Sequence, residues 1–190
     1  MRVISGKAGG RRLLEPADCS VRPTTDKVKE SIFNIIQFDI EGRRALDLFA
    51  GSGQLGIEAL SRGSKSAVFV DESRQAAALV RGNLKKTGLE QAASVVQGDS
   101  ISFLKRSGKF DLIFLDPPYD TQLLEKSLSL IEEFDILTQG GIIICESRVE
   151  KELPELSSPY RRLKSYKYGK IKVTTFTRDP EEQKENGDCK

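Results

Sequence analysis

Residues 45–60 read ALDLFAGSGQLGIEAL, an apolar run followed by three glycines and then by a second apolar stretch. Gly51, Gly53 and Gly56 form the pattern GxGxxG, at the point where a strand of about 44–48 turns into a helix of about 54–62. Glycines at such a turn let the backbone approach a ligand closely, and the start of the helix offers unpaired backbone amides. This stretch therefore predicts a ligand site at a strand-to-helix turn.

The same alternation continues along the chain beyond this stretch. Further strands are expected at about 67–70, 93–96, 110–115 and 141–145, separated by amphipathic segments of helical length at about 73–87, 99–106 and 121–134. A helix capped by Thr24 or Thr25 is expected to precede the first strand. Alternating strands and helices predict a mostly parallel sheet with helices on both faces.

Two hairpins are expected to complete the fold. Residues 160–167 and 170–177 turn at Gly169 and predict an antiparallel C-terminal hairpin. Short strand candidates at 2–4 and 11–14 predict a small N-terminal β-hairpin extension. The predicted fold class is therefore α/β and Rossmann-like, with a mostly parallel seven-stranded sheet.

Charge divides the chain into three parts. Residues 1–14 hold four basic groups and no acid, and 159–178 hold seven and no acid. From residue 179 onward there are five acids, two lysines and no apolar periodicity, which is typical of disorder. We therefore expect an N-terminal basic β-hairpin extension at 1–20, a main domain at 21–178 and an acidic disordered tail at 179–190.

Composition excludes several classes of protein and site. The 190 residues are 38% hydrophobic and 31% charged, which is a globular balance, and no apolar run is long enough for a membrane span. The chain has no His, and Cys19, Cys145 and Cys189 are far apart, so His-based catalysis, a zinc cluster and a redox dithiol are all excluded. We expect no metal. Charges at Arg2 and Lys7 interrupt any signal peptide, so we expect a cytoplasmic protein without membrane association.

Three acids suggest which ligand the glycine turn takes. Asp47 ends the strand before the turn, where its carboxylate would repel a dinucleotide's pyrophosphate but attract an ammonium and a sulfonium, as in S-adenosylmethionine. Asp71, in VFVDES, would accept the ribose hydroxyls. Asp99, in GDS, would contact the adenine end and also cap the helix beginning at Ile101. The alternative for Asp47 is a carboxylate that only bonds to a loop or caps a helix.

The strand FDLIFL ends in DPPY, which comprises Asp116, Pro117, Pro118 and Tyr119. In an open α/β sheet this turn and the glycine turn lie side by side, at the carboxyl ends of their strands. Two prolines stiffen the backbone and remove two donors. Asp116 and the Pro117 carbonyl would then accept both hydrogens of a nucleobase exocyclic amine, and Tyr119 would stack on the base.

Four motifs follow one another along the chain in this order: DLFAGSG, the acid of VFVDES, GDS and DPPY. Together they resemble the motifs of the class I S-adenosylmethionine-dependent amino-group methyltransferases. The N-terminal part of the chain reads MRVISGKAGGRRL and then RPTTDKVKESIFNII. It is similar to the corresponding part of the bacterial 16S ribosomal RNA guanine-N2 methyltransferases of the RsmD type. The resemblance runs from Met1 to about Arg178. It implies transfer of a methyl group from S-adenosylmethionine to a guanine N2 amine, with S-adenosylhomocysteine as product and without a covalent enzyme intermediate.

The resemblance also implies site residues. The expected catalytic residues are Asp116, Pro117, Pro118 and Tyr119. The expected cofactor-binding residues are Thr24, Thr25, Asp47, Phe49, Gly51, Ser52, Gly53, Asp71, Asp99 and Ser100. The expected RNA contacts are Arg22 and six residues of the two basic clusters, namely Arg2, Lys7, Arg11, Arg12, Arg161 and Arg162.

The expected partner is ribosomal RNA or the small ribosomal subunit, bound by a monomer. Two alternatives stay open at this point. The second enzyme hypothesis is a DNA adenine-N6 methyltransferase, since DPPY also serves adenine. The lack of a separate target-recognition domain argues against it. A non-catalytic RNA- or nucleotide-binding protein would leave the combination of Asp47, the glycine turn and DPPY unexplained.

Overall fold

The structure, a computed structural model, describes residues 1–16, 26–119 and 121–180. Thr24, Thr25 and Arg22 of the expected site therefore lie outside the described residues, as do positions 181–190 of the expected tail.

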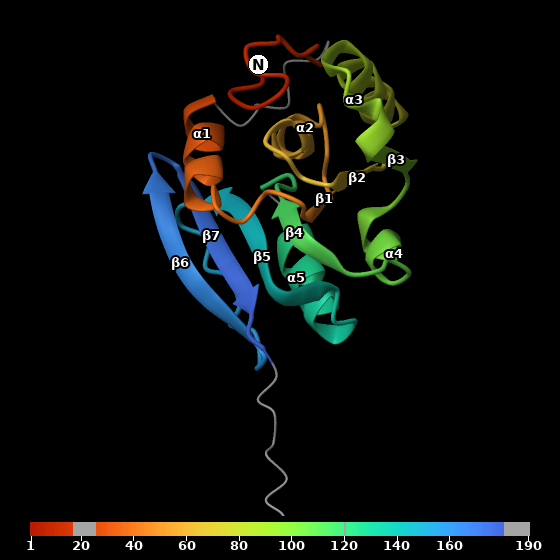
Figure 1. Ribbon diagram of the computed structural model, residues 1–190. Helices are drawn as coiled ribbons and strands as arrows, with labels where there is room; N and C mark the ends of the chain where they lie inside the picture. Colours follow the sequence, from red (N-terminus) through yellow and green to blue (C-terminus); the bar gives the residue numbers. More distant parts are fainter. Residues whose placement is uncertain (17–25, 120, 181–190) are drawn as a thin grey trace, which may run out of the picture.

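Seven strands form one sheet in the order β3-β2-β1-β4-β5-β7-β6 (Figure 1). They are β1 (Arg44–Asp47), β2 (Ser66–Asp71), β3 (Ala93–Gln97), β4 (Phe110–Leu115), β5 (Leu137–Arg148), β6 (Tyr160–Tyr168) and β7 (Ile171–Arg178). The strands β1 to β5 pair in parallel, whereas β7 runs antiparallel to both β5 and β6. The predicted α/β, Rossmann-like fold with an antiparallel C-terminal hairpin is confirmed.

Helices cover both faces of this sheet. They are α1 (Asp26–Ile35), α2 (Gln54–Ser61), α3 (Arg74–Thr87), the 3-10 turn η1 (Glu90–Ala92), α4 (Ser100–Leu104) and α5 (Leu123–Glu133). One buried cluster joins α1, α2 and α3 to one face through side chains such as Phe33, Ile57 and Val80. A second joins α4 and α5 to the other face through Leu104 and Leu128. Successive strand residues point to opposite faces, so each central strand contributes to both clusters.

Gly56 shows why the glycine turn passes into this particular helix. A Cβ at Gly56 would lie 2.3 Å from a ring carbon of Phe69 in β2, and Phe69 is completely buried. Only glycine allows α2 to approach the sheet so closely. The third glycine of the motif therefore serves helix packing, while the first two shape the turn.

The N-terminal segment folds back on itself as the expected hairpin does, although its arms form no regular strands. The arms share one antiparallel bridge, between Arg2 and Arg12, and backbone hydrogen bonds also join them, such as the one from the Val3 N–H to the Arg11 carbonyl at 2.9 Å. The buried carboxylate of Glu58 in α2 accepts the backbone N–H groups of Ile4 at 2.7 Å and Ser5 at 3.0 Å. Val3, Ala8 and Leu13 are buried in the first core cluster. The segment is therefore packed as part of the main domain.

Candidate active site

Four acids stand at the carboxyl ends of four adjacent strands. Asp71 ends β2, Asp47 ends β1, Asp116 follows β4, and Glu146 lies near the end of β5. Each comes two residues after a member of the first core cluster, so strand alternation places all four on the same face. Those preceding residues are Phe69, Ala45, Phe114 and Ile144. The sheet order β2-β1-β4-β5 makes them a continuous row, which we call the acid row.

Asp47 lies at the centre of the acid row and is 3% exposed. Its carboxylate accepts the backbone N–H of Gly56 at 2.9 Å. Burial raises the pKa of Asp47 to about 8, the charges of Asp116 and Asp71 act in the same direction, and the Gly56 N–H opposes them. Gly56 lies in the first turn of α2, so this bond is the helix cap that was left open as the alternative for Asp47. Asp47 is thus a carboxyl group whose ionised form a nearby cation would stabilise.

Asp71 holds the glycine turn from the neighbouring strand. Its two carboxylate oxygens accept the N–H of Gly51 at 2.8 Å and of Ser73 at 2.9 Å. Gly51 has φ +52° and Gly53 has φ +77°, a left-handed backbone that favours glycine. A Cβ on Gly51 would meet no atom within 4 Å. The turn therefore presents its backbone to open space beside two carboxylates.

The other residues of the glycine turn are buried to different degrees. Phe49 is partly buried against the second core cluster. Ser52 is buried, and its carbonyl accepts the Asn83 side chain at 2.9 Å. Gln54, at the start of α2, is 7% exposed, and its side-chain oxygen is buried and has no hydrogen-bond donor among the described residues. An unpaired buried acceptor at this position suits a ligand donor such as an ammonium group.

Asp99 and Ser100 begin α4 at the end of β3. Asp99 accepts the N–H of Ser102 at 2.8 Å as a helix cap, and hydrogen bonds from Ser102 lower the pKa of Asp99. The predicted cap is therefore confirmed, and the adenine contact stays a prediction. The Ser100 hydroxyl donates to the Leu48 carbonyl at 2.8 Å, which joins α4 to the end of β1.

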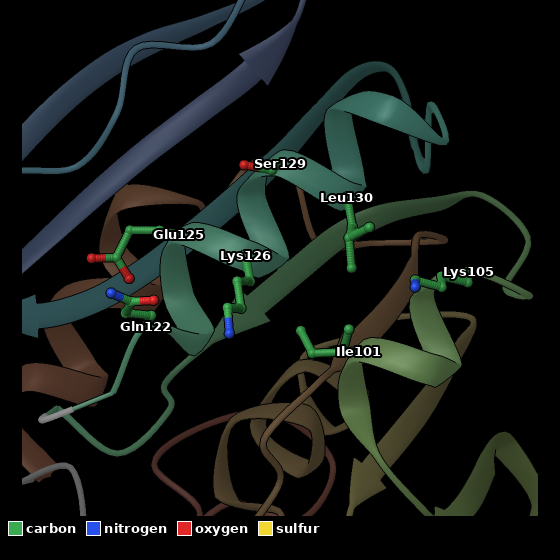
Figure 2. A pocket seen from close by; sticks show the side chains of 7 residues that line it. All are labelled: Ile101, Lys105, Gln122, Glu125, Lys126, Ser129 and Leu130. Atoms are coloured by element: carbon green, nitrogen blue, oxygen red, sulfur yellow. The ribbon is translucent and has the colours of Figure 1, made fainter.

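A groove of about 430 Å³ lies between α4 and α5, next to these two residues. Figure 2 shows Lys105 and Ile101 extending from α4 and Lys126 and Leu130 from α5. The remaining residues that line the groove are Gln122, Glu125 and Ser129. Ile101 directly follows Ser100, so the groove opens beside the predicted adenine end of the ligand.

The DPPY turn follows β4, adjacent to β1 in the sheet. Asp116 is half-buried, Pro117 is buried and Pro118 is exposed. The Pro118 carbonyl accepts the Thr121 hydroxyl at 2.7 Å, which fixes the end of the turn. The Tyr119 hydroxyl donates to the Glu146 carboxylate at 2.6 Å. The glycine turn and the DPPY turn thus lie side by side, as the motif order predicts.

The predicted N-terminal RNA contacts lie on one segment, but they differ in how far their side chains are bound to the rest of the protein. Arg2 is exposed and its guanidinium lies 3.8 Å from Asp26, and Lys7 and Arg12 are exposed. Arg11 instead donates to the Thr87 carbonyl at 2.7 Å, at the C-terminal end of α3. Part of this cluster is therefore used to attach the segment to the domain.

The predicted C-terminal RNA contacts are both engaged within the protein. Arg161 pairs with Asp179 at 2.6 Å. Arg162 donates to the Leu153 carbonyl at 2.7 Å, and its guanidinium lies over the Phe176 ring at 5.6 Å. These internal contacts compete with any phosphate contact, so we keep Arg161 and Arg162 only as predictions.

Sequence reasoning did not single out Glu146, Gln54 or Ile101. Glu146 follows the apolar run IIIC, which is the same strand-end signal that marked Asp47 and Asp116. Gln54 and Ile101 each lie one residue beyond a predicted site residue. Within 1–16, 26–119 and 121–180, no group of three His, Cys, Asp or Glu side chains is arranged to hold a metal ion. None of the helices in these ranges is long and apolar enough to cross a membrane.

Comparisons with known proteins place the chain in a family. The family described as "Conserved hypothetical protein 95" matches residues 1–177. The Bacillus subtilis protein named "Putative rRNA methyltransferase YlbH" is 47% identical over 180 residues, covering 93% of this chain and 98% of that protein. "Ribosomal RNA small subunit methyltransferase D" of Escherichia coli is 35% identical over 182 residues, covering 94% of this chain and 90% of that protein.

A solved structure agrees with these sequence matches. The structure titled "Putative methyltransferase yhhF from Escherichia coli" aligns with a TM-score of 0.84 and 33% identity. The alignment covers 94% of this chain and 98% of that one, so the shared fold includes nearly all the elements described above.

Proposed function

The chain belongs to the family described as "Conserved hypothetical protein 95", and from that premise we propose that it methylates the N2 amine of a guanine in 16S ribosomal RNA, using S-adenosylmethionine. The observation that carries this proposal is the pair of adjacent turns on the acid row, one suited to a cationic methyl donor and the other to an amine. The reaction class is methyl transfer within one crevice.

The residues present fit S-adenosylmethionine. Its ammonium and sulfonium match the acid row around Asp47 and the unpaired oxygen of Gln54, and the open backbone at Gly51 leaves room for a ligand. Asp71 would hold the ribose, and Asp99 and Ser100 would hold the adenine end next to Ile101. A pyrophosphate would meet like charge along this whole row, which disfavours a dinucleotide.

The acceptor side is assigned to the DPPY turn. Asp116 and the Pro117 carbonyl would accept the two hydrogens of the guanine amine and so direct its nitrogen toward the crevice. Tyr119 would stack on the base. Orientation of this kind supplies most of the acceleration, because the lone pair of this amine is delocalised into the ring and is a poor nucleophile.

Bound S-adenosylmethionine would supply the methyl group, whose bond to sulfur would break as its bond to the guanine nitrogen forms, leaving S-adenosylhomocysteine. Positive charge would develop on that nitrogen, and the Asp116 carboxylate would stabilise it. Asp116 or water then takes the proton. No covalent enzyme intermediate is required.

The RNA contacts are assigned chiefly to the exposed basic groups of the N-terminal segment, Arg2, Lys7 and Arg12, with Arg22 following in the sequence. We take the active form to be a monomer, because both turns of the crevice come from one chain. The proposed ribosomal RNA substrate implies a cytoplasmic protein. Analytical ultracentrifugation of the protein alone tests the oligomeric state.

The experiment has two stages. Titration with S-adenosylhomocysteine and with NAD should give binding of the first and none of the second. Tritiated methyl transfer is then offered to small ribosomal subunits, naked 16S RNA and DNA, and the labelled nucleoside is identified by chromatography. N2-methylguanosine from RNA supports the proposal, whereas N6-methyl-2′-deoxyadenosine from DNA would establish the alternative.

A further inference from the structure

Glu146 is a second carboxylate beside the DPPY turn, and the proposed function leaves it without a role. Leu115 of β4 pairs with Cys145 of β5, so Asp116 and Glu146 follow at the same level of two adjacent strands. Glu146 is only 3% exposed. A carboxylate is costly to bury unless it accepts hydrogen bonds, so its position at the end of the crevice calls for a partner.

One partner of this carboxylate is the phenol of Tyr119. The Tyr119 hydroxyl donates to Glu146 Oε1 at 2.6 Å, a distance typical of a strong bond to a charged acceptor. This bond ties the DPPY turn to β5, although the two residues are 27 positions apart in the sequence. Tyr119 is the aromatic residue of that turn, so the bond fixes one end of the proposed stacking surface.

Arg148 restrains the same ring from another direction. Its guanidinium carbon lies 5.9 Å from the centroid of the Tyr119 ring, within the range of a cation–π contact. One contact holds the hydroxyl end and the other approaches a face, and together they limit both rotation and tilt of the ring. A base stacking on Tyr119 would then use the face away from Arg148.

We propose that Glu146 is a positioning residue for methyl transfer, which holds the Tyr119 ring in the orientation on which the target base stacks. This inference rests on the proposed function. A base on a fixed ring presents its amine to Asp116 in one geometry, and misplacement by about 1 Å can cost roughly 100-fold in rate. Glu146 acts through Tyr119 and does not touch the base.

The test compares three variants with the wild-type protein in methyl transfer to RNA. Glu146→Ala should lower kcat at least about tenfold, while the Kd for S-adenosylhomocysteine and the KM for S-adenosylmethionine stay within about twofold. Glu146→Gln should recover most of the activity, because its amide oxygen still accepts the hydroxyl. Glu150→Ala, an exposed acid just beyond the same strand, is the control and should behave as wild type.

A double variant separates positioning from general loss of stability. Tyr119→Phe keeps the ring but removes the hydroxyl, so it breaks the same bond from the other side. The double variant Tyr119→Phe/Glu146→Ala should be no slower than Glu146→Ala alone, because the two changes remove one interaction. Thermal melting of each variant identifies a protein that has not folded.

Several results would overturn this assignment. They are wild-type kcat for Glu146→Ala, equal impairment of Glu146→Gln, multiplicative losses in the double variant, or a parallel loss of S-adenosylhomocysteine binding. Should Glu146→Ala not fold, wild-type kcat for Tyr119→Phe would overturn it. Failure of the wild-type protein to methylate RNA would refute the proposed function itself, which makes the two failures distinguishable.

Discussion

The glycine turn after β1 and the DPPY turn after β4 follow neighbouring strands, yet different kinds of hydrogen bond fix their conformations. In the glycine turn, side-chain carboxylates accept backbone N–H groups, from Gly56 to Asp47 and from Gly51 to Asp71. In the DPPY turn, two prolines remove such donors, and a side-chain bond from Tyr119 to Glu146 attaches the turn to β5. Ligand binding and turnover should therefore respond separately to mutation.

The sharpest way to separate the two turns is to remove Asp116. We expect Asp116→Ala to lower turnover by about 1,000-fold, because it removes the group to which the proposal assigns orientation of the amine and stabilisation of its developing charge. Binding of S-adenosylhomocysteine, measured by calorimetry, should change by less than about threefold, because the glycine turn, to which the proposal assigns this ligand, is left intact. Unchanged turnover would remove Asp116 from the mechanism, and abolished binding would merge the two turns into one unit.

The glycine turn should show its own dependence on pH. The pKa of Asp47 is raised to about 8, and the ammonium group of S-adenosylhomocysteine would favour the ionised carboxylate. Affinity for S-adenosylhomocysteine should therefore fall by up to about tenfold per pH unit as the pH drops from 8 to 6. Asp47→Asn should bind weakly at pH 8 and lose this slope, whereas Asp39→Asn, in the loop that precedes β1, should keep it. A flat wild-type profile would contradict this assignment.

The same raised pKa has the opposite sign for stability. Between the ordinary value of 3.8 and about 8, the folded protein binds the Asp47 proton more tightly than the unfolded chain does. The free energy of unfolding contributed by this group therefore falls as pH rises through that window. Urea titrations of wild type and Asp47→Asn at pH 5 and pH 8 should show a smaller decline in the variant.

A smaller effect is expected from the third glycine of the motif. A Cβ at Gly56 would lie 2.3 Å from the buried Phe69 ring, and such overpacking costs about 1–3 kcal/mol, offset by about 1 kcal/mol of helix propensity. Gly56→Ala should therefore lower the melting temperature. Gly108→Ala is the matched control, since its Cβ would meet nothing within 4 Å. If Gly56→Ala melted at the same temperature as the wild-type protein, α2 would have to be able to move away from β2.

The smallest effect concerns the basic groups outside both turns. Arg12 is exposed, whereas Arg161 pairs with Asp179 at 2.6 Å. Arg12→Glu should weaken RNA binding a few-fold and reduce the slope of log affinity against log salt by about 1. Arg161→Glu should have less effect on that slope. Filter binding at several salt concentrations measures both, and equal slopes for the two variants would remove the distinction.

The sequence alone predicted most of the architecture because its signals are local and periodic. The strand expected at about 110–115 is β4 as observed, and the helix expected at about 73–87 is α3 within one residue. β5 was expected at about 141–145 but runs from Leu137 to Arg148, since its ends lack a continuous apolar run. The sequence predicted that the N-terminal segment folds back on itself, but not that it binds α2, because nothing near Ile4 and Ser5 in the sequence indicates a bond to Glu58.

For the site, sequence determined which chemical groups stand at the strand ends, since a glycine turn and DPPY each follow an apolar strand. Tertiary structure decided which partners those groups bond to. It placed Asp47 against Gly56, Arg11 on the end of α3 and Glu146 on Tyr119. These contacts depend on strand order and on the burial of charge, which are properties of the folded sheet and not of any local stretch of chain.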